Sequence, residues 1–263
     1  MKIISWNVAG LRALLKKNNL YDLIKNINPD IICFQETKAE EHQIELIDEI
    51  KQLYPYRYWN SNKGLVQRKG LSGTAIFSKI EPINILPIPL FDNEGRVISL
   101  EFNINNINFI LINVYVPNSQ KIGTERFNFR NIWNNELNKY LISLNKEIVL
   151  CGDMNVAHKD IDIVNPNSKR NKIAGFYDME RNNMSEIIFN MNYIDVYRYT
   201  NQNKQESTYW SNFLKQPRSE INGWRIDYFL ISYNLFKIIK NNHKYENLIN
   251  IYGSDHCPLL FEF

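Results

Sequence analysis

Several polar side chains of this sequence stand where a short apolar run ends. Asn7, Glu36 and Asp153 each follow such a run, and Asn155 lies two residues beyond Asp153. Asp227 lies inside the apolar run Ile226-Asp227-Tyr228-Phe229-Leu230. Acidic groups in such places are costly to bury unless they are paired or bound to a metal. Because strand ends along one sheet edge can converge on a pocket, we expect one site assembled from across the chain.

The residue types indicate which chemistry that site would carry. Carboxylate and amide oxygens suit Mg²⁺ or Mn²⁺ rather than zinc, and such a metal neutralises charge on a phosphoryl oxygen. The hard oxygen ligands or bases are Glu36, Asp153, Asp227 and Asp255, and Asn7 and Asn155 are neutral orienting groups. These groups predict metal-assisted attack of water on a phosphodiester.

A histidine and a tyrosine complete the expected site. His256 follows Asp255 near the C-terminus, and Asp227 offers a carboxylate for it. A carboxylate that holds one imidazole nitrogen fixes the tautomer and favours the charged ring. Tyr115 ends another apolar run and offers a phenol to a phosphate oxygen.

Each of these residues alone has a simpler interpretation. His256 would more often be structural or solvated, and Glu36 could be a charge at the start of a helix. Gly152-Asp153 would most often form a turn, and Tyr115 could be an ordinary aromatic residue at a strand end. Asp227 is stronger by itself, because an acid in so apolar a run needs a partner. The joint pattern favours the functional interpretation.

Strands with interspersed helices must position these groups. β-branched runs predict strands at Lys2–Trp6, Ile31–Phe34, Thr74–Ser78, Val97–Phe102, Phe109–Val114, Ile148–Cys151, Arg225–Ile231 and Leu259–Phe263. Helical spacing predicts helices at Tyr21–Ile27, Glu40–Leu53 and Thr124–Leu144. The short connection 103–108 predicts an antiparallel hairpin. We expect a mixed, two-sheet α/β sandwich in a single domain over residues 1–263.

Composition limits the alternatives. The chain has 263 residues, a formal charge of +3 and three cysteines without C-x-x-C spacing. We therefore expect buried thiols in a reducing compartment and no structural zinc. No apolar stretch approaches the roughly 18–20 residues of a membrane span, and the start lacks a signal peptide. The charge permits a nucleic-acid partner without requiring one.

The order of the motifs resembles the exonuclease III and class II abasic (AP) endonuclease family. The matching segments are Ser5-Trp6-Asn7-Val8-Ala9-Gly10-Leu11-Arg12, Gln35-Glu36-Thr37-Lys38, Asn113-Val114-Tyr115-Val116-Pro117-Asn118, Cys151-Gly152-Asp153-Met154-Asn155-Val156-Ala157-His158, Ala174-Gly175-Phe176-Tyr177-Asp178-Met179-Glu180-Arg181, Gly223-Trp224-Arg225-Ile226-Asp227-Tyr228-Phe229-Leu230 and Gly253-Ser254-Asp255-His256-Cys257-Pro258. The resemblance extends from residue 3 to about residue 260.

The resemblance implies a four-layered, DNase I-like α/β sandwich and a Mg²⁺-dependent nuclease in which Mn²⁺ can substitute. It implies Glu36 as the principal metal ligand, with Asn7 and Asp255 in or near the metal shell. Asp153 would position or deprotonate the attacking water, and Asn155 would help to orient it; as oxygen donors, both are also candidate metal ligands. His256, paired with Asp227, and Tyr115 would contact the scissile phosphate.

The implied substrate is double-stranded DNA with an abasic site, cut on the 5′ side to leave a 3′-hydroxyl, with 3′→5′ exonuclease activity beside it. Backbone contacts are expected from Arg12, Lys38, Asn118 and Arg218. A baseless sugar flips out cheaply, and Tyr209, Leu214 and Trp224 are candidates for the apolar pocket that receives it.

One departure and two alternatives belong to this interpretation. Ala9 stands where many relatives carry Asp or Asn, which puts a second metal position in doubt. The skeleton of Asn, Glu, Asp-x-Asn and Asp-His is shared by other Mg²⁺-dependent phosphodiesterases and phosphatases of the wider superfamily. A DNA-binding module with a dead site would predict broken carboxylates, yet these are intact. We expect a cytoplasmic monomer, nucleoid-associated in a prokaryote, or a nuclear or organellar protein in a eukaryote.

Overall fold

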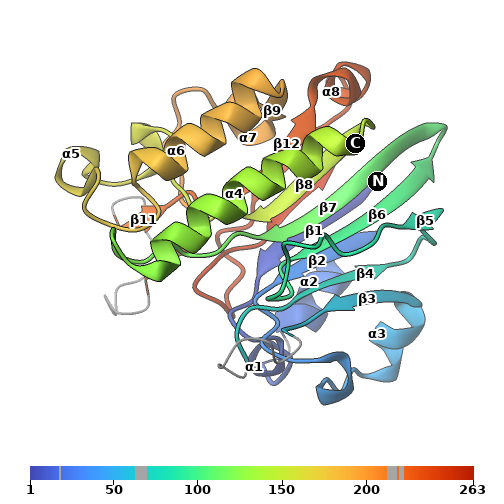
Figure 1. Ribbon diagram of the computed structural model, residues 1–263. Coiled ribbons are helices and arrows are strands. Elements are labelled where there is room, and N and C mark those ends of the chain that lie inside the picture. The colour runs from blue at the N-terminus through green and yellow to red at the C-terminus, as the bar shows by residue number, and fades with distance from the viewer. Residues whose placement is uncertain (18, 63–69, 212–217, 219–221) are drawn as a thin grey trace.

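Two six-stranded mixed sheets pack face to face in the computed structural model, which describes residues 1–17, 19–62, 70–211, 218 and 222–263 (Figure 1). The first sheet has the order β13 (Lys244–Asn247), β14 (Leu259–Glu262), β1 (Lys2–Asn7), β2 (Ile31–Gln35), β4 (Thr74–Ser78) and β3 (Tyr56–Asn60). The second has the order β5 (Asn84–Ile85), β6 (Val97–Ile104), β7 (Ile107–Tyr115), β8 (Ile148–Asp153), β12 (Asp227–Ser232) and β9 (Tyr193–Asp195).

The main core lies between the two sheets. Cys33 and Ile76 of the first sheet meet Leu111, Cys151 and Phe229 of the second in one buried cluster. Helices cover the outer faces of both sheets, so the central strands are buried on both sides and read as continuous apolar runs. All residues of β2 and of β8 are buried for this reason.

The helices form the two outer layers. α1 (Leu11–Leu15), α2 (Asn19–Ile27) and α3 (Asp48–Leu53) pack on the first sheet. On the second sheet, α4 (Glu125–Ser143) buries Trp133, Leu137 and Leu141 beside α6 (Asp178–Ser185) and a π-helical turn at Glu186–Asn190. Shorter pieces are α5 (Pro166–Lys169), α7 (Val196–Thr200), α8 (Tyr233–Ile239) and 3₁₀ turns at Glu41–Gln43 and Asp160–Asp162. The predicted four-layered sandwich is confirmed.

Most predicted elements form, but one predicted helix forms only over its second half. The predicted strands are all present, and β6 pairs antiparallel with β7 as expected. The predicted helix Glu40–Leu53 is wrong over its first half: a 3₁₀ turn ends at Gln43, and Ile44 is extended with φ −112° and ψ 115°. The chain stays extended until α3 because Ile44 and Leu46 pack into the core beneath the helices. The burial of Ile44 and Leu46 therefore decides the local conformation, against the helix that the spacing of the apolar residues predicts.

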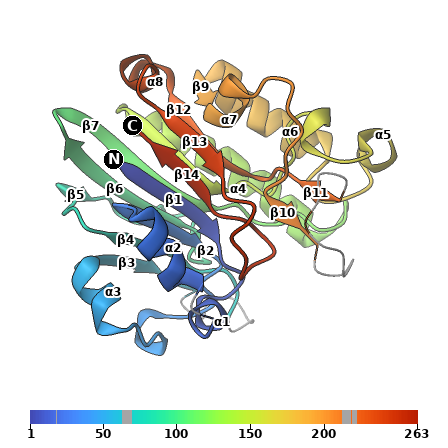
Figure 2. The ribbon, with the colours of Figure 1, turned by 180° about the vertical axis from the view of Figure 1, so that it is seen from behind.

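The sheet topology brings the polar strand ends to one end of the molecule. β1 runs parallel to β2, so Asn7 lies beside Gln35, and β7 runs parallel to β8, so Tyr115 lies beside Asp153. β12 runs antiparallel to β8 and places Asp227 opposite Asp153. A two-stranded sheet, β10 (Tyr209–Trp210) and β11 (Gly223–Trp224), lies apart from the two large sheets (Figure 2).

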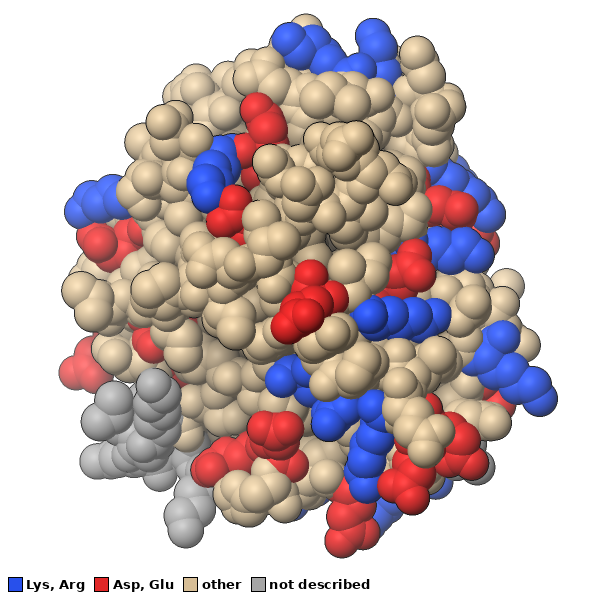
Figure 3. All heavy atoms as spheres, turned by 90° about the vertical axis from the view of Figure 1, so that its right-hand side faces the viewer, with Lys and Arg blue, Asp and Glu red and all other residues tan. Residues whose placement is uncertain are grey.

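The right-hand side of Figure 1, where β1 begins, mixes both signs of charge. Basic and acidic side chains lie next to one another there instead of forming a single basic field (Figure 3). Among the described residues, the charge of this face is therefore mixed, unlike the one-sided basic patch that is typical of a nucleic-acid surface. The cysteines Cys33, Cys151 and Cys257 are free and buried, as expected. Within the described part of the chain, no helix is long and apolar enough to cross a membrane.

Candidate active site

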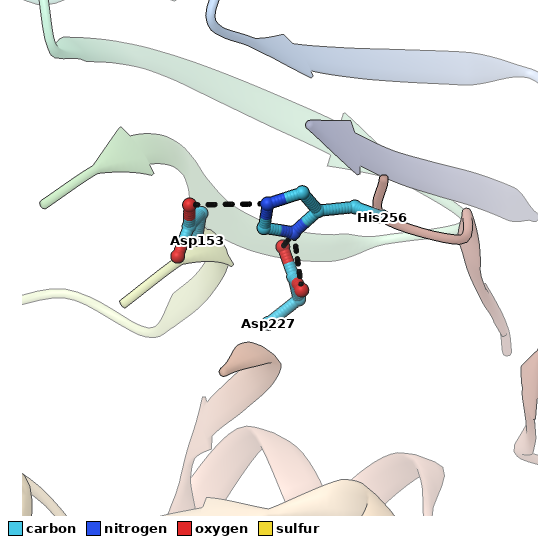
Figure 4. A group of neighbouring side chains, drawn as sticks. All are labelled: Asp153, Asp227 and His256. Atoms are coloured by element: carbon cyan, nitrogen blue, oxygen red, sulfur yellow. Dashed lines mark hydrogen bonds and ion pairs between the residues drawn. The ribbon is translucent and has the colours of Figure 1, made fainter. Parts of the chain in front are cut away.

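A buried histidine–carboxylate pair lies at the centre of the site (Figure 4). The Nδ1 atom of His256 lies 2.9 and 3.1 Å from the two carboxylate oxygens of Asp227. The hydroxyl of Thr208 donates to Asp227 Oδ2 at 2.6 Å. Burial alone would lower the pKa of His256, but the charge and hydrogen bond of Asp227, together with the charges of Asp153 and Asp255, outweigh burial and raise the pKa to about 10. The imidazole is therefore a cation at neutral pH, and His256 is not a solvated residue.

Asp153 faces this cation at the end of β8. Its Oδ2 lies 4.0 Å from His256 Nε2, and its Oδ1 accepts the backbone N–H of Asn155 at 2.8 Å. Burial, and after it the charge of Asp227, raise the pKa of Asp153 to about 7. A carboxyl group with such a pKa can accept a proton near neutral pH.

Asn7 connects the carboxylates of the two sheets. Its Nδ2 donates to Glu36 Oε1 at 3.0 Å and to Asp153 Oδ2 at 2.9 Å. Its Oδ1 accepts the backbone N–H of Ala9 at 3.0 Å. Asn7 is thus placed to orient the two acids, as its residue type suggested, and its role as a metal ligand stays a prediction.

Glu36 lies just past the end of β2 with a positive φ of 53°. The ammonium of Lys38 lies 2.8 Å from its Oε2. Burial acts to raise the pKa of Glu36, but the charge and hydrogen bond of Lys38 outweigh burial and lower it. The structure thus places a positive charge directly on this carboxylate, which is the environment that a bound cation would also supply.

Gly152 lets β8 approach β7 closely enough to put Tyr115 beside Asp153. Its φ is +137°, and an added Cβ would lie 1.9 Å from the carbonyl oxygen of Val114. The turn that Gly152-Asp153 alone would suggest is not formed, because both residues belong to β8. Burial, followed by the charge of Glu36, raises the pKa of Tyr115 well above its ordinary value. Its phenol therefore keeps its proton.

Asn155 and Asn118 extend this network toward solvent. Asn155 Nδ2 donates to the carbonyl of Val116 at 2.9 Å, and Asn118 Nδ2 donates to Asn155 Oδ1 at 3.2 Å. Asn118 is exposed, as a residue that contacts a ligand must be. Its predicted contact with a DNA phosphate stays a prediction.

One cavity of about 600 Å³ is lined both by polar groups of this site and by aromatic side chains. Its acidic and polar side includes Glu36, Tyr115, Asn118, Asp153, Asn155, Asp255 and His256, and its other side includes Lys169, Tyr209, Trp224 and Ile226. The Trp224 ring packs on Gly175, where an added Cβ would lie 3.1 Å from the ring. Leu214, predicted for the same pocket, lies outside the described residues.

The predicted DNA-binding cations occupy different places. Arg12 is exposed, and its Nη2 lies 3.4 Å from the carbonyl of Lys38. Arg218 donates to the carbonyls of Ile249, Ile251, Ser254 and His256 at 2.7 to 2.9 Å and stacks on Trp210 and Tyr252. Arg218 therefore holds the segment that carries Asp255 and His256, and its DNA contact stays a prediction.

Two residues of this site have no signal in the sequence. Thr208 lies outside every segment quoted for the resemblance, yet its hydroxyl also accepts the backbone N–H groups of Ile226 and Asp227, both at 3.1 Å. Lys169 lines the cavity with its ammonium 5.4 Å from the centre of the Trp224 ring. Neither periodicity nor composition distinguishes Lys169 from an ordinary surface lysine.

The oxygen donors offer a place for a divalent cation. The carboxylate and imidazole atoms of Asp153, Asp227 and His256 lie within 4.8 Å of one another. However, His256 Nδ1 is already bonded to Asp227, and the charged ring repels a cation. Glu36 and Asp255 line the same cavity with Asp153 and present carboxylate oxygens without a histidine partner. This side of the cavity fits a hard cation better.

Comparison with known proteins agrees with this geometry. The model of the endonuclease/exonuclease/phosphatase family matches residues 4–256. An exodeoxyribonuclease of Bacillus subtilis is 39% identical over 98% of this chain and 98% of its own length. A DNA-(apurinic or apyrimidinic site) endonuclease of Dictyostelium discoideum is 39% identical over 98% of this chain and 69% of its own length. The structure of an AP endonuclease from Archaeoglobus fulgidus superposes with a TM-score of 0.82 and 27% identity, covering 100% of this chain and 99% of the other.

Proposed function

Because the chain belongs to the endonuclease/exonuclease/phosphatase family, we propose that it is a metal-dependent DNA repair nuclease that hydrolyses the phosphodiester 5′ of an abasic site and leaves a 3′-hydroxyl. The same site would trim 3′ ends, as the name of the Bacillus relative suggests. We take residues 1–263 as one catalytic domain that acts as a monomer. The observation that carries the proposal is the charged His256–Asp227 pair facing Asp153 across a cavity open to a ligand.

The surroundings of each side chain indicate the role that we assign to it. Asp153, with its pKa raised to about 7, accepts the proton of the attacking water. His256, held as a cation by Asp227, donates a hydrogen bond to a phosphate oxygen as negative charge develops there. Tyr115 keeps its phenolic proton and donates a hydrogen bond to the same phosphate. Asn7 and Asn155 fix the orientation of Asp153.

We propose Mg²⁺, with Mn²⁺ as a substitute, as the metal of this site. Glu36 and Asp255 would hold it, with Asn7 or Asp153 beside them. When bound, the ion neutralises charge on the phosphoryl and leaving-group oxygens.

The aromatic side of the cavity supports abasic specificity. Tyr209 and Trp224 meet edge to face with ring centroids 6.3 Å apart. A sugar without a base leaves the duplex at little stacking cost, and a wall of this kind accepts it through apolar contact. Double-stranded DNA is therefore the proposed partner, with Arg12, Lys38 and Asn118 as the candidate backbone contacts.

Removal of the metal with EDTA distinguishes a metal-dependent nuclease from a module that only binds DNA. The purified protein is incubated with a labelled duplex carrying recessed 3′ ends, in Mg²⁺ and in EDTA, and both cleavage and binding are measured. We expect cleavage in Mg²⁺ only. Equal binding without cleavage in both buffers would contradict the proposal. Release of phosphate from small phosphomonoesters without any DNA cleavage would favour the phosphatases of this superfamily instead.

A further inference from the structure

We propose that Arg96 is a positioning residue, whose buried guanidinium fixes the ring and the backbone of Tyr115 so that the phenol faces the phosphate. This inference rests on the proposed function of the same site. Arg96 lies outside every segment that resembles the family motifs. It directly precedes β6, and Tyr115, which it contacts, is the last residue of β7.

Arg96 contacts Tyr115 in three ways. Its guanidinium carbon lies 4.4 Å from the centre of the Tyr115 ring. Its Nη1 donates to the Tyr115 carbonyl at 3.0 Å, and the Tyr115 N–H donates to the Arg96 carbonyl at 2.8 Å. Ring and main chain are therefore held by the same residue at the point where β7 ends.

A buried carboxylate holds Arg96 in turn. Arg96 Nε donates to Glu94 Oε2 at 2.6 Å, and Arg126 donates to both oxygens of Glu94 at 2.6 and 2.8 Å. Arg96 is 1% and Glu94 is 4% exposed. The two-point bond of Arg126 fixes the Glu94 carboxylate, and Arg96 is oriented by its Nε bond to that carboxylate together with its Nη1 bond to the Tyr115 carbonyl. The Arg96 plane is thus set before any ligand arrives.

Charges of both signs act on Tyr115. The guanidinium groups of Arg96 and Arg126 share the carboxylate of Glu94, and the buried carboxylate of Asp92 also interacts with the charge of Arg96. The carboxylate of Glu36 lies on the phenol side of Tyr115 and acts on its pKa in the opposite direction to Arg96. A cation against the ring face makes the phenol a stronger hydrogen-bond donor.

The side chain of Arg96 is not needed to hold its own backbone. Asp92 Oδ2 accepts the backbone N–H groups of Arg96 and Val97 at 2.7 and 2.8 Å, and it also accepts Asn60 Nδ2 at 2.7 Å. These bonds survive when the Arg96 side chain is replaced. A substitution at this position therefore acts chiefly on Tyr115 and Glu94.

A double-mutant cycle tests the inference through turnover on an abasic duplex. We expect Arg96→Met to lower kcat about 10- to 100-fold with KM changed less than about threefold, since the phenol acts on the transition state. In a Tyr115→Phe background the same change should lower kcat less than about threefold, because the group it positions is gone. Leu100→Ala is the matched control, since it creates a cavity in β6, the strand that directly follows Arg96, at a position away from Tyr115.

Equal losses from Arg96→Met in both backgrounds, or a loss no larger than that of Leu100→Ala, would overturn the inference. If Arg96→Met does not fold, Arg126→Met loosens Glu94 from its less buried end and should still lower kcat several-fold, by about 3- to 10-fold, in the Tyr115 background only. No loss in that variant would also overturn it.

A second readout does not require activity. Tyrosine labelled with ¹³C at Cζ gives a signal for Tyr115, assigned by its loss in Tyr115→Phe. We expect Arg96→Met to move that signal at fixed pH and Leu100→Ala to leave it in place. If the wild-type protein cleaves no DNA, the proposed function fails while this measurement still decides the inference. An unmoved Tyr115 signal in Arg96→Met would overturn it.

Discussion

Asp153 and His256 have different protonation states because their surroundings differ. Burial disfavours the charged form of both side chains. For His256, Asp227 bonds the ring directly and, with Asp153 and Asp255, reverses that effect; for Asp153, which carries the same sign of charge, Asp227 adds to it. Both pKa values are therefore raised, so the site combines a carboxyl group that can take up a proton near neutral pH with an imidazole that stays a cation there.

The first prediction concerns these two residues. We expect Asp153→Asn and His256→Ala to lower the rate of single-turnover DNA cleavage by about 10²- to 10⁴-fold while the affinity for DNA is retained. The reason is that neither group anchors the duplex. Cleavage rate and equilibrium binding are measured on the same duplex. Turnover like that of the wild type in His256→Ala would refute the role given to His256.

The second prediction concerns pH and stability. The folded-state pKa of His256 is raised to about 10 from an ordinary value of 6.5. Its bond with Asp227 therefore stabilises the fold fully below pH 6.5, and the contribution is lost as the pH rises toward 10. We expect the difference in Tm between the wild type and His256→Gln to be largest near pH 6 and to shrink steadily up to pH 10. A difference that stays constant over this range would contradict the pairing.

The third prediction concerns the metal. Glu36→Ala removes a carboxylate from the side of the cavity that fits a hard cation, so we expect half-maximal activity to require at least about tenfold more Mg²⁺. Activity is titrated with Mg²⁺ for the wild type, Glu36→Ala and the surface control Glu49→Ala. If all three titrations coincide, Glu36 does not hold the metal.

At the scale of elements, a buried ion network fixes the segment that leads into β12. Arg225 is fully buried, and its guanidinium donates to Asp162 at 2.8 and 3.2 Å and to Asp195 at 2.7 and 3.1 Å. The 3₁₀ turn with Asp162 and the strand β9 with Asp195 are thereby tied to Trp224 and Asp227 on either side of this arginine. The same arginine thus holds both Trp224 of the cavity wall and Asp227 of the catalytic pair in place.

The fourth prediction tests that anchor. Arg225→Met leaves the buried carboxylate of Asp195 without its ion pair and leaves Asp162 with Arg198 alone, and breaking a buried pair in this way costs about 3–5 kcal/mol. We expect a loss of that size in the free energy of unfolding, measured with denaturant. Arg57→Met serves as the control, because Arg57 lies on the edge strand β3 and its guanidinium donates to the carbonyls of Lys51 and Tyr54 at the end of α3. A loss below about 1 kcal/mol for Arg225→Met, the size of an exposed ion pair, would contradict the anchoring role.

The elements that the sequence predicts are those with a strong local signal. Central strands such as β2 and β8 carry uninterrupted apolar runs, and Thr124 caps α4 by accepting the N–H of Phe127 at 3.3 Å. The edge strand β13 and the two-residue strands β10 and β11 carry no such run. They are strands because of their pairing with neighbouring strands, so the sequence does not predict them. The helix predicted over Glu40–Leu53 fails because burial of Ile44 and Leu46 decides the local conformation.

At the scale of the whole molecule, the site could be predicted because its polar groups stand at strand ends. Topology then brings Asn7, Tyr115, Asp153 and Asp227 together from both sheets. The supporting residues could not be predicted in the same way. Arg96, Lys169 and Thr208 lie in segments without periodicity, and only the folded structure shows what they contact.

The most direct test of the account uses two duplexes that differ only in one tetrahydrofuran abasic analogue, each incubated with the protein in Mg²⁺ and in EDTA. The analogue blocks lyase chemistry, so any cut must be hydrolytic, and the product ends are mapped at single-nucleotide resolution. We expect Mg²⁺-dependent incision immediately 5′ of the analogue, leaving a 3′-hydroxyl that a polymerase extends, and no internal cut in the intact duplex. Equal internal cutting of both duplexes, or no incision of either, would contradict it.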